Sequence, residues 1–129
     1  MKKILLMLVA LIATSFSAMA EDIYIVAGSE ELCGTAWDCT DLNNKMTDNG
    51  DGTYSKTFTN VAAMNGYQFK VTKNGTEWYG DEAGNNITFN VTTACDVTIT
   101  FNATTFESTV TGSGVQAYAF NVEKVLAVG

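Results

Sequence analysis

The segment from Trp78 to Asn86 groups side chains that suit carbohydrate binding. It begins with two aromatic residues, Trp78 and Tyr79, and runs through two acidic residues to the amides of Asn85 and Asn86. An aromatic ring stacks on the flat C–H face of a sugar, while amides and carboxylates bond its hydroxyls. We expect Trp78 and Tyr79 to present their rings to solvent together in one loop, with Asn85 and Asn86 beside them.

Two more residues extend this candidate site. Lys70 falls on the outward side of the preceding predicted strand, from which its ammonium group could reach the same loop. Trp37 lies in a Gly-Thr-Ala-Trp-Asp loop, where it forms either a second wall of the site or a plug against the edge of the sheet. The alternative for Trp78 is that its ring covers the end of the core and the polar residues solvate a turn.

Catalytic and metal chemistry find little support in the sequence. Asp81 and Glu82 are adjacent, so they cannot flank a scissile glycosidic bond as an acid and base pair. The chain has no histidine, the commonest general base and metal ligand. The run Asp48–Asp51 lacks the ligand spacing of a calcium loop. We therefore expect no enzyme activity, no metal and no cofactor.

The elements that must position these residues are short strands. Apolar and polar residues alternate with period two over residues 67–72, 87–92, 96–101 and 106–111, and Asp48–Gly52 carries the Asn-Gly and Asp-Gly pairs of tight turns. The sequence predicts an all-β fold without helices, an immunoglobulin-like β-sandwich of two antiparallel sheets. The alternation places Phe106 on an inward face with Ser108 and Val110. The expected aromatic core comprises Tyr54, Phe58, Tyr67, Phe69, Phe89 and Phe101.

The first twenty residues have the pattern of a secretory signal. Lys2 and Lys3 precede an apolar run at Ile4–Ile12, and Ala18-Met19-Ala20 matches a cleavage site. We therefore divide the chain into a signal peptide at 1–20, a module at 21–112 and a tail at 113–129. The tail is either a linker with the start of a second module or a last edge strand. The signal has a bacterial pattern and predicts a secreted, cell-surface or periplasmic location.

Charge narrows the choice of partners. The formal net charge of −7 becomes −9 once Lys2 and Lys3 are removed with the signal. Such an acidic surface repels phosphate backbones and anionic headgroups, so nucleic acid and membrane insertion are not expected. A neutral polysaccharide is not repelled.

The three cysteines allow three pairings. Cys33, Cys39 and Cys95 remain in the exported part of the chain, and an oxidising compartment favours one disulfide with one thiol left over.

The order of motifs resembles a known family. The motifs are Cys33-Gly34-Thr35-Ala36-Trp37-Asp38, Asn44-Lys45-Met46-Thr47, Asp51-Gly52-Thr53-Tyr54, Tyr67-Gln68-Phe69-Lys70-Val71, Trp78-Tyr79-Gly80, Gly84-Asn85-Asn86-Ile87 and Asp96-Val97-Thr98-Ile99-Thr100-Phe101. Together they resemble the starch-binding or starch-associated sandwich modules of bacterial pullulanases and amylases and of cell-surface starch-capture proteins.

This resemblance implies a non-catalytic module that binds α-glucan polysaccharide or maltooligosaccharide, alongside further modules of a larger glucan-degrading system. It also implies a Cys33–Cys95 disulfide, because these two cysteines fall at the recurring positions. The alternative function is a structural spacer or protein-interaction module of a multi-module surface or secreted protein, and a small hydrolase is the weakest reading.

Overall fold

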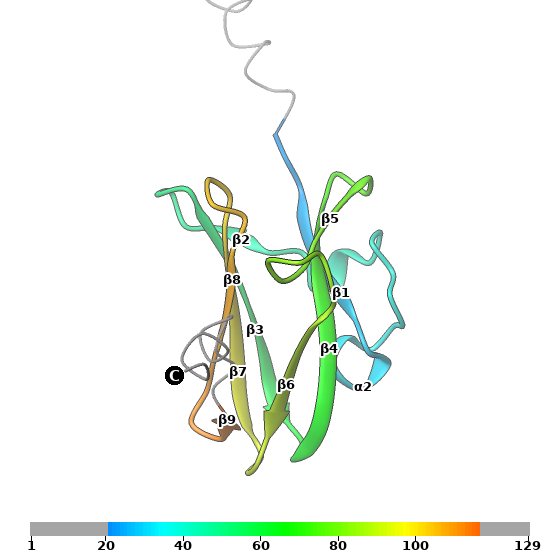
Figure 1. Cartoon of the computed structure of the whole chain (residues 1–129), viewed down its shortest axis with the longest axis vertical. Helices are drawn as coiled ribbons and strands as arrows, with labels where there is room; N and C mark the ends of the chain where they lie inside the picture. Colours follow the sequence, from blue (N-terminus) through cyan, green and yellow to red (C-terminus); the bar gives the residue numbers. More distant parts are fainter. Residues whose placement is uncertain (1–20, 117–129) are drawn as a thin grey trace, which may run out of the picture.

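Two antiparallel sheets face each other across one core (Figure 1). The computed structural model describes residues 21–116. Within this range the five-stranded sheet contains β1 (Tyr24–Gly28), β4 (Met64–Lys73), β6 (Ile87–Val91) and β9 (Val115–Gln116) in that order, and β5 (Glu77–Tyr79) also pairs with β4. The four-stranded sheet has the order β2 (Thr47–Asp48), β3 (Thr53–Val61), β7 (Cys95–Asn102) and β8 (Ser108–Thr111). The predicted all-β sandwich is confirmed.

The core forms because the alternating strands turn their apolar sides toward each other. Tyr67, Phe69 and Val71 of β4 are buried, and Ile99 and Phe101 of β7 are buried opposite them. Burying a large apolar side chain contributes about 1.5–3 kcal/mol. Of the expected aromatic core, Tyr54 is only partly buried against the cluster and the other five members are buried.

The predicted Asp48–Gly52 turn joins β2 to β3. Gly50 and Gly52 have φ values of 86° and 95°, which glycine adopts without the cost that other residues incur. The Asp48 carboxylate accepts a hydrogen bond from the Gly50 backbone N–H at 2.8 Å and closes the turn.

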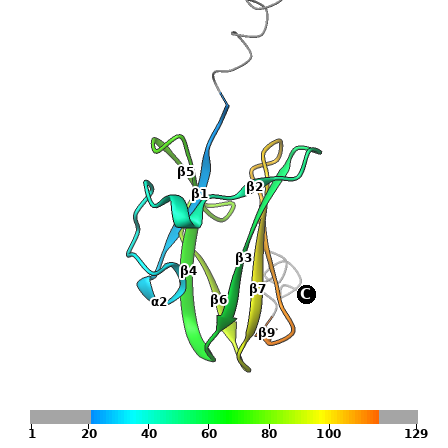
Figure 2. The ribbon, with the colours of Figure 1, turned by 180° about the vertical axis from the view of Figure 1, so that it is seen from behind.

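Two short helices interrupt the loop that follows β1. The α-helix α2 (Glu30–Cys33) and the 3₁₀ helix η1 (Leu42–Asn44) have four and three residues. Neither is long enough to show helical periodicity, so the prediction of no helix was wrong here. This loop lies beside β1 and β4 (Figure 2), and its helix α2 also contacts β3 of the other sheet. No helix within residues 21–116 is long and apolar enough to cross a membrane.

The predicted signal peptide lies outside the described residues, as does the tail from residue 117 onward. At the start of that tail, β9 pairs with β6 as an edge of the five-stranded sheet. The domain limits remain predictions.

The Cys33–Cys95 disulfide that the resemblance implied is wrong, because all three cysteines are free thiols. The Cys33 thiol donates to the Val26 carbonyl oxygen at 3.8 Å, within the five-stranded sheet. The Cys95 sulfur accepts from the Gly114 backbone N–H at 3.2 Å, beside the turn before β9. The two sulfurs are therefore directed at different parts of the backbone.

We predict that the purified protein, unfolded without a reductant, releases three titratable thiols. In the folded protein at pH 8, Cys33 should react slowest, because burial raises the pKa of its thiol to about 11 and leaves little nucleophilic thiolate. Alkylation followed by peptide mass spectrometry measures both quantities. Release of only one thiol from the unfolded chain would contradict the structure.

Candidate functional site

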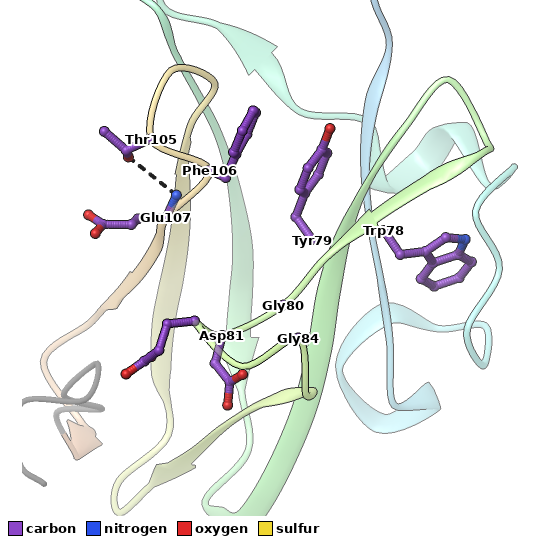
Figure 3. A pocket seen from close by; sticks show the side chains of 9 residues that line it. Trp78, Tyr79, Gly80, Asp81, Gly84, Thr105, Phe106 and Glu107 are labelled. Atoms are coloured by element: carbon purple, nitrogen blue, oxygen red, sulfur yellow. Dashed lines mark hydrogen bonds between the residues drawn. The ribbon is translucent and has the colours of Figure 1, made fainter.

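Trp78 and Tyr79 lie on strand β5 and not in a loop as predicted. β5 pairs with the end of β4, with Thr72 opposite Trp78 and Val71 opposite Tyr79. Successive side chains of a strand point to opposite faces of the sheet. The Trp78 indole accordingly points away from Tyr79, whose ring faces Phe106 (Figure 3). The prediction that the two rings form one exposed platform is wrong.

Trp78 lies on the outer face of the five-stranded sheet, the face turned away from the core. Its side chain is 40% exposed. Its cross-strand partner Thr72 is fully buried, and the Thr72 hydroxyl donates to the Ile25 carbonyl oxygen of β1 at 3.0 Å. Strand β4 is thus bonded to β1 next to Trp78, while the indole ring remains accessible to solvent.

Lys70 shares this outer face. It lies two residues before Thr72 on β4, and continuing the β4–β5 register places it opposite Gly80. A Cβ atom at Gly80 would collide with the Asn85 carbonyl oxygen and would lie 3.1 Å from Cε of Lys70. The absence of a side chain at Gly80 therefore leaves room for the lysine stem.

An amide pair continues the same face. The Asn86 amide donates to the Gln68 side-chain oxygen at 3.0 Å, and Gln68 is on the Lys70 side of β4. Trp78, Lys70, Gln68 and Asn86 are hereafter the outer-face site. Gln68 was not predicted as a member, although its polar position in the alternating pattern of β4 was visible.

The other two predicted binding residues, Asn85 and Trp37, do not belong to the outer-face site. Asn85 is exposed in the turn after β5, where its backbone N–H donates to Asp81 Oδ1 at 2.8 Å. Trp37 is 36% exposed, and its backbone N–H donates to the Gly28 carbonyl oxygen at 2.8 Å. That bond places the Trp37 backbone beyond the β1 edge, so β1 and β4 separate it from the backbone of Trp78.

On the other side of β5, Tyr79 and Phe106 stack. Their ring centroids are 4.8 Å apart and their planes differ by 8°. Phe106 is 50% exposed with φ of 69°, and β8 begins only at Ser108. The prediction of Phe106 as an inward strand residue was wrong, because residues 103–107 form the connection between β7 and β8.

Tyr79 remains a hydrogen-bond donor at neutral pH. Its hydroxyl donates to the Glu77 carboxylate, and this bond, together with desolvation, raises the pKa of Tyr79 to about 12.

The nearby acidic residues have a structural role in the turn. Asp81 Oδ1 accepts from the Ala83 backbone N–H at 2.9 Å as well as from Asn85, so this carboxylate closes the turn between β5 and β6. Among residues 21–116, no group of three or more histidine, cysteine or acidic side chains is placed to hold a metal ion.

Comparisons with known proteins agree with the fold. The family model described as "Pullulanase X25 domain" matches residues 24–108. The solved structure "Pullulanase from Bacillus acidopullulyticus" matches with a TM-score of 0.61 and 18% sequence identity. That match covers 70% of this chain and 11% of the other, so the chain spans a small part of that pullulanase. No curated protein matches the chain.

The family match extends from the first residue of β1 to the first residue of β8 and includes the residues of the outer-face site. The resemblance to starch-associated modules of pullulanases is thereby confirmed, and the chain belongs to the Pullulanase X25 domain family.

Proposed function

We propose that this protein is a non-catalytic carbohydrate-binding module that holds starch-like α-glucan on the outer-face site. The observation that carries the proposal is the accessible Trp78 indole on the same sheet face as Lys70 and the Gln68–Asn86 amide pair. The family supports the choice of ligand, because pullulanases are associated with α-glucan.

The chemistry of the site matches a neutral polyhydroxyl ligand. The indole provides an apolar plane for the C–H face of a glucose ring. The Lys70 ammonium donates hydrogen bonds, and the amides of Gln68 and Asn86 both donate and accept them. Trp78, Lys70 and Gln68 sit on paired strands and Asn86 is hydrogen-bonded to Gln68, so little order must be gained when a glucan binds.

The site is open, and this limits its affinity. It lies on a sheet face and encloses only one side of a glucan chain, whereas tight small-molecule sites bury most of the ligand. We expect modest affinity with little dependence on salt, because the ligand carries no charge.

A binding role also fits the acidic residues of the described chain. Asp81 holds the turn through Oδ1, and Asp81 and Glu82 are too close in sequence to act on opposite sides of a glycosidic bond. We therefore propose an accessory module of an exported glucan-degrading protein, with the signal peptide at residues 1–20 directing export.

We predict that Trp78→Ala weakens binding to amylopectin at least roughly tenfold, the loss expected for an aromatic anchor worth about 1.4 kcal/mol or more. Affinity electrophoresis in gels containing amylopectin or glycogen measures the change as lost retardation. Leu42→Ala is the matched control, because Leu42 is an exposed apolar side chain, 66% accessible, and belongs to η1 beside β1, not to β4 or β5. Unretarded migration of the wild-type protein in every glucan would favour the spacer alternative.

We also predict that Lys70→Met reduces affinity severalfold, because it keeps the aliphatic stem over Gly80 and removes the hydrogen-bonding ammonium group. Lys73→Met is the control on the same strand, since Lys73 pairs with Glu77 and has the opposite orientation to Lys70. The same gels measure both variants. Equal effects of the two substitutions would argue that only the general charge of the protein matters.

A further inference from the structure

A second aromatic surface lies behind the outer-face site. It is a groove of about 420 Å³ between the β5–β6 turn of one sheet and the β7–β8 connection of the other. We call it the inter-sheet groove, and Tyr79, Asp81, Thr105, Phe106 and Glu107 are among the residues that line it (Figure 3). Its volume falls in the usual range of small-ligand sites, which is roughly 300–1,000 Å³.

We propose that the inter-sheet groove binds a second segment of α-glucan, so that one module holds glucan on both sides of β5. This inference rests on the proposed function for the class of ligand, and it adds a site and a stoichiometry that the outer-face site does not require.

The first support is the ring pair. Phe106 stacks on Tyr79 and Tyr79 packs on Phe101, with ring centroids 5.3 Å apart, so the pair is anchored in the core. Half of the Phe106 surface nevertheless remains exposed, although burying it would be favourable. Its positive φ is uncommon for a bulky residue, and the surrounding fold maintains it. The result is a fixed, accessible aromatic surface of the kind that stacks on sugars.

The second support is the set of hydrogen-bonding groups around the rings. The Glu107 carboxylate has no hydrogen-bond partner within residues 21–116, while its backbone N–H donates to the Thr105 hydroxyl oxygen at 3.3 Å. The lining includes no basic side chain. Carboxylates accept hydrogen bonds from sugar hydroxyls, whereas a phosphorylated or other anionic ligand would be repelled.

Strand β5 lies between the two sites: Trp78 is among the residues that line the groove, but its indole points to the side opposite the Tyr79 ring (Figure 3). Trp78 and Tyr79 are consecutive, so the sheet itself separates the rings that would contact the two glucan segments (Figure 3). Two sites on one module increase apparent affinity for a polymer without any new contact, provided the polymer reaches both.

Titration calorimetry of the full chain with maltoheptaose tests the proposal. The part of the tryptophan fluorescence that is lost in Trp78→Ala, and so does not come from Trp37, is the readout of the outer-face site. We expect a stoichiometry of two for the wild-type protein and for Leu42→Ala. Phe106→Gly should lower it to one and leave the fluorescence titration unchanged. Glycine accepts the positive φ at this position, so this variant removes the ring without adding strain. Trp78→Ala should also retain one site.

A stoichiometry of one in the wild-type protein, unchanged in Phe106→Gly and lost in Trp78→Ala, would overturn the groove and leave the outer-face site intact. Binding that survives Trp78→Ala but disappears in Phe106→Gly would instead reject the outer-face site and support the groove. An unchanged thermal unfolding midpoint confirms that each variant is folded.

Discussion

The alternation of side chains along β5 is the constraint on which the account of this site depends. Trp78 and Tyr79 are neighbours in sequence, and the pairing of β5 with β4 forces their rings to opposite faces of the sheet. Tyr79 packs against Phe101 and Phe106, which fixes the direction of the strand's side chains. Because a one-residue shift in register would exchange the two rings, the exposure of Trp78 is a consequence of core packing.

The same register arranges the polar part of the outer-face site. β4 carries apolar Phe69 and Val71 toward the core, and this leaves Gln68 and Lys70 on the outer face. Gly80 lets the lysine stem cross to the neighbouring strand, and Asp81 holds the turn that delivers Asn86 to Gln68. The arrangement of the outer-face site is therefore a by-product of ordinary sandwich packing, together with one glycine and one turn.

Sequence patterns gave a sound account of the fold and a partial one of the site. The alternation of apolar and polar residues identified the core strands, because one side of each strand is buried. Tyr67 and Phe69 of β4 are examples. The pattern failed at Phe106, because the alternation of β8 extends backward into the turn that precedes this strand. It also failed at β5, because a three-residue strand has no measurable period and exists through its pairing with β4. Local sequence does not show which distant segments pair. The Cys33–Cys95 disulfide was inferred from the resemblance alone, and the structure has all three cysteines free.

The central claim is that α-glucan lies across Trp78 and Lys70 on the outer face of the five-stranded sheet. Nuclear magnetic resonance of the ¹⁵N-labelled protein during addition of maltoheptaose tests it most directly, because each amide and the Trp78 indole N–H report their own surroundings. The account predicts saturable shifts of the indole signal and of the amides of Gln68, Lys70 and Asn86. If these signals stay in place while glucan is added to saturating concentration, the outer face does not bind glucan.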